Sequence, residues 1–497
     1  MANNSVGKKI WSMANVLSDD GVGSGDYLEQ ITYLLFIKMA DEYSKPPYNR
    51  NVGIPNGEND TYDCTWSTLI SKSGSELSEH YDEVLKTLAK QPGILGEIFI
   101  NSKNLISQPA MLFRLIKMID EESWISMATD VKGDIYEDLL KKTTEDVKSG
   151  AGQYFTPRPL ISAIVKCMNP EPNKTINDPC CGTGGFLLSA KSYIESNYTL
   201  DSDQKRFLKF EQFRGTELVR NTYRLCLMNL LLHNISDFTA NIPIRRADSL
   251  LNDTGERYDY VLTNPPFGKR SSQTFTNEEG VQEKEDVTYN RQDFWAASSN
   301  KQLNFIQHIH TILGAHGKCA VVIPDSVLFE GGAGEIVRNK LLETTDLHTI
   351  LRLPSGIFYA QGIQANVMFF DNKPASPNPQ TKEVWIYDFR TDIKFTLKQN
   401  PMKESDLDDF VKCYNPANRK QRVETYSEKD LNGRWRKFTY DEIIENDKTS
   451  LDLKWIKTGE DISDISIEDI FNDIKENANI ISQSVVELEE LIGKVEK

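Results

Sequence analysis

The amino-acid sequence predicts an α/β protein built around a doubly wound, mostly parallel β-sheet, with helical segments before and after it. Three observations predict this fold. Residues up to about 130 carry apolar side chains at three- and four-residue spacing, which is typical of helices. From about Ile161 short apolar runs alternate with helical stretches, and a glycine-rich turn joins the first run to its helix. Such alternation is typical of parallel sheets, which bind ligands at the carboxyl ends of their strands.

The elements of the central region follow in chain order. The sequence predicts strands at Lys174–Asn177, Phe213–Glu217, Ile244–Asp248, Tyr258–Leu262, Lys318–Ile323, Leu347–Leu353, Asn366–Phe370 and Val384–Tyr387. It predicts helices at Phe186–Ile194, Asn221–His233 and Leu303–Leu313. We therefore divide the chain into a helical N-terminal domain (1–130), a central α/β domain (131–400) and a C-terminal region (401–497).

Three segments depart from this pattern. Residues 44–66 are rich in Pro, Asn and Gly and are expected to form a loop. Residues 268–291 are polar, mixed in charge and without apolar period, which predicts a mobile loop. Residues 466–495 predict a long amphipathic helix, which either packs on its own domain or docks onto a partner chain. Both interpretations of that helix stay open here.

Composition limits the classes of protein that remain. The chain has 73 acidic against 57 basic residues, a net charge of -16, whereas a protein that grips nucleic acid alone is usually basic. If this chain acts on DNA, we expect a partner chain to supply many of the contacts with the DNA. The seven cysteines form no CxxC pair, so we expect no metal site and a reducing, cytoplasmic location. No apolar run approaches the roughly 20 residues of a membrane span, and we expect neither a membrane segment nor a signal peptide.

The segment from Asn177 to Phe186 predicts a cofactor site. Its glycines, among them Gly184 and Gly185, let backbone approach a ligand closely, and the helix behind them offers unpaired N–H groups. The spacing differs from the dinucleotide pattern G-x-G-x-x-G. Asp178 adds negative charge, which suits a ligand with a cationic end, such as the amino group of a methionine moiety.

Two further carboxylates extend this site. Glu217 ends the next strand, where it can accept hydrogen bonds from both hydroxyls of a ribose. Asp248 ends the third strand and can accept from an adenine amino group, although it can equally cap the following turn with its side chain. Carboxylates at successive strand ends favour an adenosyl cofactor over a plain tight turn.

The sequence Asn264-Pro265-Pro266-Phe267 follows the fourth strand and predicts a catalytic site. Consecutive prolines leave the sheet rigidly and leave the Pro265 carbonyl free. The Asn264 side-chain oxygen and the Pro265 carbonyl can hold the two N–H bonds of an aromatic amine, so that its nitrogen attacks a sulfonium methyl group. Phe267 offers a face on which an extruded base can stack.

These motifs, in this order, resemble the N6-adenine DNA methyltransferases, and more closely the modification subunit of type I restriction–modification systems. The resemblance extends across nearly the whole chain and implies a Rossmann-like S-adenosylmethionine-dependent methyltransferase domain. It carries over Asn264, Pro265, Pro266 and Phe267 as catalytic residues. It also carries over, as cofactor contacts, Gln153, Tyr154, Phe155, Thr156, Pro157, Arg158, Thr183, Gly184, Gly185 and Glu217. The double cysteine before the glycines departs from the family, where small residues are more usual.

The resemblance also implies partners. In that family a separate specificity subunit reads the sequence of double-stranded DNA, two modification subunits clamp the duplex, and a restriction subunit can join them. A chain that does not itself read the DNA sequence needs fewer contacts with DNA phosphates, which agrees with the net negative charge.

Two alternatives remain: a methyltransferase with another substrate, and a protein of a different class. Asn-Pro-Pro-aromatic sequences also occur in methyltransferases that act on glutamine side chains of proteins or on RNA, but those smaller enzymes lack the helical N-terminal region and the segment Gln153–Leu160. The chain could instead be a DNA-binding assembly scaffold with a vestigial site. Intact Asp178, Glu217 and Asn264 argue against that interpretation.

Overall fold

The computed structural model describes residues 12–23, 26–50, 52–58, 61–125, 156–238, 241–268, 272–276, 282–286, 288–289, 291–358, 364–390, 395–396 and 400–456. For 272–276 and 282–286 it describes the backbone only. The predicted C-terminal helix (466–495) and the predicted cofactor contacts Gln153, Tyr154 and Phe155 lie outside the described residues.

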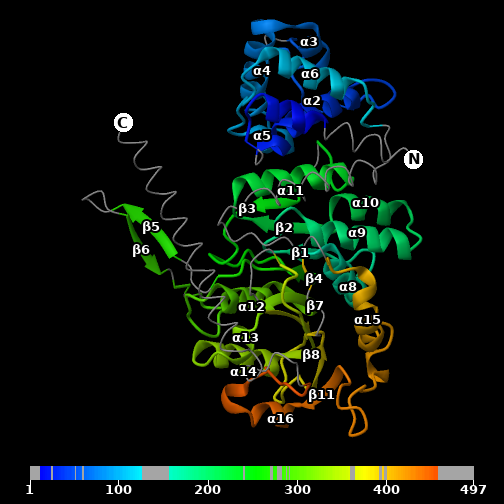
Figure 1. Cartoon of the computed structure of the whole chain (residues 1–497), viewed down its shortest axis with the longest axis vertical. Helices are drawn as coiled ribbons and strands as arrows, with labels where there is room; N and C mark the ends of the chain where they lie inside the picture. The colour runs from blue at the N-terminus through cyan, green and yellow to red at the C-terminus, as the bar shows by residue number, and fades with distance from the viewer. Residues whose placement is uncertain are drawn as a thin grey trace.

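The N-terminal region is helical, as predicted. Its helices are α2 (Tyr27–Ser44), α3 (Trp66–Ser71), α4 (Gly74–Leu88), α5 (Gly93–Phe99) and α6 (Pro109–Asp120). The described residues of the predicted loop between α2 and α3 form no helix. These helices form one end of the molecule (Figure 1). Arg224, buried on α11 (Arg220–Leu232), pairs with Glu29 of α2 and donates a hydrogen bond of 2.7 Å to the Ile100 carbonyl. A buried ion pair therefore ties this helical region to the sheet domain.

The central region is built on a nine-stranded mixed sheet, which confirms the predicted fold class. Its strands lie in the order β11-β10-β8-β9-β7-β4-β1-β2-β3. They are β1 (Ile176–Asp178), β2 (Phe213–Glu217), β3 (Ile244–Arg246), β4 (Tyr258–Thr263), β7 (Leu313–Pro324), β8 (Thr345–Arg352), β9 (Ala365–Asn372), β10 (Glu383–Asp388) and β11 (Trp435–Thr439). β1, β2, β3, β4 and β7 pair in parallel, as do β8 and β10.

Two strands depart from the parallel arrangement. β9 pairs antiparallel with both β7 and β8, and the described residues between Arg352 and Ala365 form no crossover helix, which a parallel neighbour would need. β11 pairs antiparallel with β10 at the sheet edge, and the sequence analysis did not predict it. The strand pattern was correct, but apolar periodicity does not reveal strand direction.

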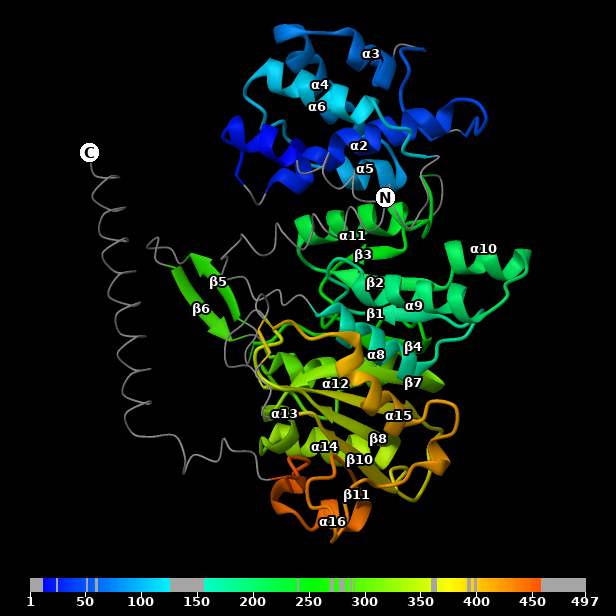
Figure 2. The same cartoon turned by 45° about the vertical axis from the view of Figure 1, so that its right-hand side comes forward.

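Helices cover both faces of the sheet, and the chain extends from the N-terminal helices through the sheet to α16 (Figures 1 and 2). The remaining helices are α8 (Arg158–Met168), α9 (Gly185–Asn197), α10 (Ser202–Phe210), α12 (Lys301–Ile312), α13 (Ser326–Phe329), α14 (Ala333–Thr344), α15 (Asp408–Tyr414) and α16 (Tyr440–Ile444), with short 3₁₀ turns at Glu404–Leu407, Arg419–Gln421 and Asp447–Thr449. Tyr260 and Leu262 of β4 pack into one core and Val261 into the other, as the alternation of a strand requires.

One expectation was wrong in part. Residues 268–291 were predicted to be a mobile loop without regular structure, but Ser272–Thr276 (β5) and Gln282–Asp286 (β6) pair as a two-stranded antiparallel sheet. The mobility itself stays a prediction. The sequence analysis relied on apolar periodicity, which these polar and charged residues lack. Backbone hydrogen bonds between strands form without apolar side chains.

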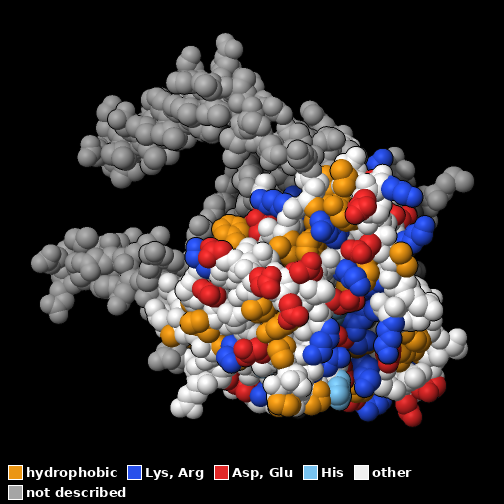
Figure 3. Space-filling model, turned by 90° about the horizontal axis from the view of Figure 1, so that it is seen from below, with side chains coloured by type: hydrophobic (Ala, Val, Ile, Leu, Met, Phe, Trp, Pro, Cys, Tyr) orange, Lys and Arg blue, Asp and Glu red, His pale blue; other side chains and the backbone are white. Residues whose placement is uncertain are grey.

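Charge is unevenly distributed on the surface. At the end of the molecule that carries α16, acidic and basic side chains are mixed, and Lys and Arg side chains are concentrated along one side (Figure 3). Among the described residues, no helix is long and apolar enough to cross a lipid bilayer. No group of three or more side chains suited to a metal ion occurs in the described part of the chain.

Candidate active site

The two predicted motifs meet at one edge of the sheet. β1, which leads into the glycine turn, pairs directly with β4, which leads into Asn264-Pro265-Pro266-Phe267. Both strands are parallel, so their carboxyl ends lie side by side. This adjacency is the geometric condition on which a shared cofactor and substrate site depends.

A buried hydrogen-bond network joins the two strand ends. The Thr263 hydroxyl donates to Asp178 Oδ1 at 2.6 Å, and the Cys180 backbone N–H donates to the same oxygen at 3.1 Å. Cys180 Sγ lies 2.9 Å from Thr263 Oγ1, and since the single Thr263 proton is already given to Asp178, the thiol must be the donor. Asp178 is 2% exposed, and burial raises the pKa of its carboxyl group to about 7. Asp178 thus connects the ends of β1 and β4 through hydrogen bonds. Its contact with the amino group of a ligand stays a prediction.

The glycine turn has the geometry of a close backbone approach. Gly184 stands at the start of α9 with a φ of +88°, and a Cβ there would lie 3.2 Å from Cys226 Sγ. Gly182 also has a positive φ, and open space surrounds its Cα. Asn229 of α11 donates at 2.9 Å to the Thr183 carbonyl and holds the turn from behind. A side chain at Gly184 would therefore both strain the backbone and displace the α11 packing.

The double cysteine is part of this packing. Cys181 Sγ lies 3.8 Å from Cys226 Sγ, a van der Waals contact between free thiols. Burial raises the pKa of the Cys180 thiol well above its usual value. These thiols therefore fill space in a crowded turn and are not activated as nucleophiles.

Glu217 links the end of β2 to the glycine turn. Its carboxylate accepts hydrogen bonds from the Gly182 N–H at 3.1 Å and from the Val219 N–H at 2.7 Å. The side chain is 8% exposed, and burial raises the pKa of its carboxyl group. The next residue, Leu218, is 60% exposed. Leu218, which the sequence analysis did not single out, therefore exposes apolar surface beside the Glu217 carboxylate.

Asp248 takes the capping role that the sequence left open. It lies beyond the end of β3, and its Oδ1 accepts from the Leu250 N–H at 2.9 Å. Its Oδ2 accepts from the Tyr289 hydroxyl at 2.8 Å. Contact with an adenine amino group stays a prediction for Asp248, whose observed partners belong to the protein.

Asn264 is held in one orientation by Thr156. The Asn264 Nδ2 group donates to Thr156 Oγ1 at 2.8 Å, and Thr156 is buried just before α8. This leaves Asn264 Oδ1 buried and without a hydrogen-bond partner among the described residues. Buried acceptors are nearly always satisfied in proteins, so an orphaned oxygen at a strand end points to a ligand donor. Thr156, predicted as a cofactor contact, is thus also the residue that orients Asn264.

The proline segment is fixed from the other side of the site. Gln302 of α12 donates through Nε2 to the Pro266 carbonyl at 2.6 Å and is 2% exposed. The preceding Pro265 carbonyl accepts no hydrogen bond from a described residue. Phe267 meets Phe358 edge to face, with 5.4 Å between ring centroids. Sequence reasoning missed Gln302, because nothing local marks a helix-start glutamine as the partner of a distant carbonyl.

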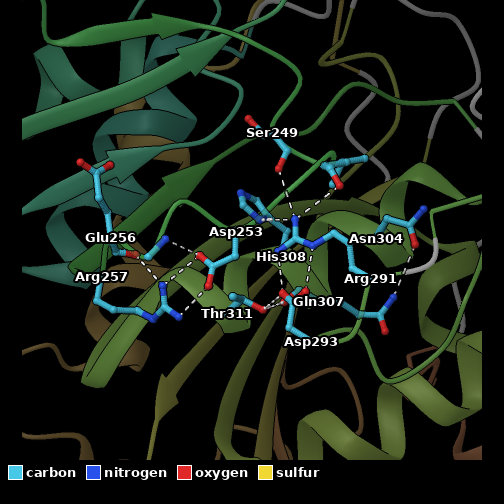
Figure 4. A network of polar contacts seen from close by, with 12 residues as sticks. Ser249, Asp253, Glu256, Arg257, Arg291, Asp293, Asn304, Gln307, His308 and Thr311 are labelled. Carbon is cyan, nitrogen blue, oxygen red and sulfur yellow. Dashed lines mark hydrogen bonds and ion pairs between the residues drawn. The ribbon is translucent and has the colours of Figure 1, made fainter.

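A second polar network fixes the segments that surround the site (Figure 4). The Arg291 guanidinium pairs with Asp293, donates to the carbonyls of Ser249 and Leu250 at 3.4 Å, and lies 3.1 Å from His308 Nδ1. Burial lowers the pKa of His308 to about 3, so its imidazole is neutral and accepts from Arg291. The Ser249 hydroxyl in turn donates to the Pro179 carbonyl at 2.5 Å. The residues after the β5–β6 pair are therefore connected to the glycine turn.

The remaining predicted contacts flank the turn. Arg158 donates through its guanidinium to the Gly185 carbonyl at 3.4 Å, and Pro157 immediately precedes α8. The structure thus brings Thr156, Arg158, Gly185 and Asn264 together at one place. Gln153, Tyr154 and Phe155 cannot be compared, because they lie outside the described residues.

Family models match most of the chain. A model described as N-6 DNA Methylase matches residues 127–463, and a model described as HsdM N-terminal domain matches residues 6–119. The sheet, the glycine turn and the Asn-Pro-Pro-Phe corner lie within the first match. The fold and the site therefore define a DNA N-6 methylase.

Individual relatives narrow this class. The chain is 36% identical to the type I restriction enzyme StySPI methylase subunit of Salmonella potsdam and to the EcoKI methylase subunit of Escherichia coli K12, over 93% of this chain and 90% of each relative. The crystal structure of the EcoKI M protein is 31% identical, with a TM-score of 0.54 and coverage of 97% and 96%. A chain from a study of complex assembly in the type I R-M system gives a TM-score of 0.75 at 25% identity, covering 99% of both chains. The chain belongs to the family of type I restriction enzyme methylase subunits.

The raised pKa of Asp178 makes a prediction about stability. The folded pKa of about 7 lies above the unfolded value of 3.8, so the folded state holds this proton more tightly and loses stability as pH rises toward 7. Between about pH 5.5 and pH 7 we expect the free energy of unfolding to fall by about 2 kcal/mol, and to level off above that range.

Urea unfolding of the full chain at a series of pH values measures this slope. Asp178→Asn keeps an acceptor for Thr263 but has no proton to lose, and it should show a clearly smaller slope. An undiminished slope in Asp178→Asn would assign the pH dependence to other groups.

Proposed function

We propose that this chain transfers a methyl group from S-adenosylmethionine to the N6 amino group of adenine in DNA, as the modification subunit of a type I restriction–modification complex. The observation that carries the proposal is the buried Oδ1 of Asn264, which has no hydrogen-bond partner among the described residues. Thr156 holds the amide group of Asn264 at the carboxyl end of β4, beside the glycine turn. Membership of the methylase family supports the same reaction.

The residues beside Asn264 fit an adenosyl cofactor. Gly182 leaves room for close approach, Glu217 presents a carboxylate for the ribose hydroxyls, and exposed Leu218 presents an apolar surface for the adenine ring. S-Adenosylmethionine supplies an electrophilic methyl group when it is bound. We assign Thr183, Gly185 and Arg158 to the same site, since all three lie around the glycine turn.

The chain's own residues then act on the base. The lone pair of an adenine amino group is delocalised into the ring, which makes the nitrogen a poor nucleophile. Asn264 Oδ1 and the Pro265 carbonyl accept its two N–H bonds, favour a pyramidal nitrogen and hold it in line for attack. The acceptors are preorganised, because Thr156 fixes the amide and Gln302 fixes the carbonyl that follows. Phe267 supplies a ring against which an everted base stacks.

The alternative substrates are weaker interpretations. A methyltransferase for RNA or for glutamine side chains would use the same corner, but the N-terminal helical match and the 36% identity to type I subunits favour DNA. A scaffold with a vestigial site would not need an oriented Asn264 with an unpartnered oxygen. Parallel methyl-transfer assays on DNA, RNA and protein distinguish the three.

We further propose that the chain works in the cytoplasm in a complex with DNA, a specificity subunit and, in the nuclease form, a restriction subunit. Two modification subunits would share one specificity subunit. The net charge of -16 supports the proposal that partner subunits supply much of the contact with DNA, since a strongly acidic chain alone binds DNA phosphates poorly.

Asn264→Ala should reduce methyl transfer at least about 100-fold, because it removes an acceptor that matters most in the transition state. Cofactor binding measured by calorimetry should stay near the wild-type value. Asn378→Ala, a change on an exposed loop, is the matched control and should leave the rate unchanged. Full activity in Asn264→Ala would remove this residue from the mechanism.

Thr156→Val should lower kcat about tenfold, because it removes the oxygen that orients the Asn264 amide while keeping the side-chain volume. Thr156→Ser retains the hydroxyl and should restore most of the rate. Steady-state kinetics separate the two roles of Thr156. A raised KM for S-adenosylmethionine with unchanged kcat would instead make Thr156 a cofactor contact only.

The isolated chain should methylate DNA weakly or not at all until the specificity subunit is added. A radiolabelled methyl-transfer assay on target-containing duplex, with and without that subunit, measures the difference. Complexes that contain Asn264→Ala give the background. Robust sequence-specific methylation by the chain alone would refute the partner proposal.

A further inference from the structure

A second pocket lies at the β3 edge of the sheet, apart from the methylation site. It has a volume of about 540 Å³, within the range of small-molecule sites, and opens between β3, α11 and α5. Its walls include Arg214, Arg220, Arg245 and Arg246. None of the predicted cofactor or catalytic residues lines it.

The pocket exists because one face of the sheet loses its helical cover. Where β4 meets α12, this face is apolar and carries Val261 in its core. Register partners in parallel strands point to the same face, and Val261 is followed across the sheet by Asn177 and then Arg214. Residues 247–257, which connect β3 to β4, form no helix. The polar part of the face is therefore left open where a doubly wound fold normally packs a crossover helix.

Positive charge dominates the opening. Arg220, Arg245 and Arg246 make no ion pair with any described residue, and Arg245 and Arg246 are exposed. The two carboxylates in the wall have tyrosine partners: Glu256 accepts from Tyr258 at 2.7 Å, and Glu97 is hydrogen-bonded to Tyr223. Four guanidinium groups against two carboxylates give the wall a net charge of +2, in a chain whose total is -16.

The floor of the pocket carries an unused polar group. Asn177 is 4% exposed and lines the pocket, and its Oδ1 is buried without a hydrogen-bond partner among the described residues. A buried acceptor without a partner costs stability, and it can accept a hydrogen bond from a hydroxyl or amino group of a ligand. The floor thus adds an independent indication that something binds here.

We propose that this pocket is a binding site for a phosphate-bearing ligand, held by the guanidinium groups of Arg214 and Arg245, which lie on the same face of the sheet as Asn177. Asn177 Oδ1 accepts a hydrogen bond from a hydroxyl or amino group of the same ligand. Guanidinium forks match the geometry of phosphate oxygens and bind them through paired, charge-assisted hydrogen bonds. The ligand is either a free phosphate-bearing molecule or a backbone phosphate of the duplex. The site does not depend on the methylation proposal, because the two share no residue.

Calorimetric titration of the full-length chain with pyrophosphate tests the site. Wild type should bind saturably at one site per chain, and Arg214→Gln/Arg245→Gln should weaken the affinity at least about tenfold, since it removes two charge-assisted contacts. Arg114→Gln/Arg206→Gln removes the same charge from exposed positions elsewhere and should bind as wild type does. Arg245→Gln alone is a second variant within the pocket, since Arg245 is exposed, and thermal midpoints check that each variant is folded.

A second titration with a short DNA duplex identifies the source of the phosphate. Displacement of pyrophosphate by duplex, or a loss of duplex affinity confined to the pocket variants, assigns the site to the DNA backbone. Pyrophosphate binding that duplex does not displace assigns it to a free ligand. Equal weakening in the pocket and control variants would overturn the proposal, because binding would then follow total charge. Absence of pyrophosphate binding together with unchanged duplex affinity in the pocket variants would overturn it as well.

Discussion

The arrangement of the methylation site depends on one buried hydrogen bond, from the Thr263 hydroxyl to the Asp178 carboxyl group. It joins the last residues of two neighbouring strands, one leading to the glycine turn and the other to Asn264. Because Asp178 is almost fully buried, water cannot replace Thr263 as its partner, and the two loops cannot separate without leaving a polar group unsatisfied. A site that must bring a cofactor to a base within reacting distance gains from such a constraint.

Around that bond, Asn264 and the prolines are held by elements distant in the chain. Thr156 precedes α8, Gln302 begins α12, and both contact the segment through single hydrogen bonds. Each contact satisfies one group, while the acceptor beside it takes no hydrogen bond from a described residue: the Asn264 oxygen in one case, the Pro265 carbonyl in the other. The result is a rigid pair of acceptors on a rigid scaffold, which is the condition for electrostatic preorganisation.

The two faces of the sheet illustrate how the same fold provides both stability and binding. Where helices cover the sheet, residues such as Val261 build an apolar core. Where the β3–β4 connection forms no helix, the same face carries Asn177 and Arg214 and opens into a basic pocket. A strongly acidic chain can thus concentrate positive charge at one place, and local potential, not net charge, decides what binds there.

The sequence by itself determined the features that depend on local chemistry. Glycines at 182–185 predicted a close-approach turn, consecutive prolines predicted a rigid exit from β4, and apolar periodicity predicted most strands and helices. Tertiary structure decided what depends on long-range pairing: the antiparallel direction of β9, the pairing of polar β5 with β6, and the partners of Asp178, Asp248 and Asn264. The physical reason is that a side chain's type limits which hydrogen bonds it can make, whereas only the folded chain brings one donor or acceptor within reach and excludes the others.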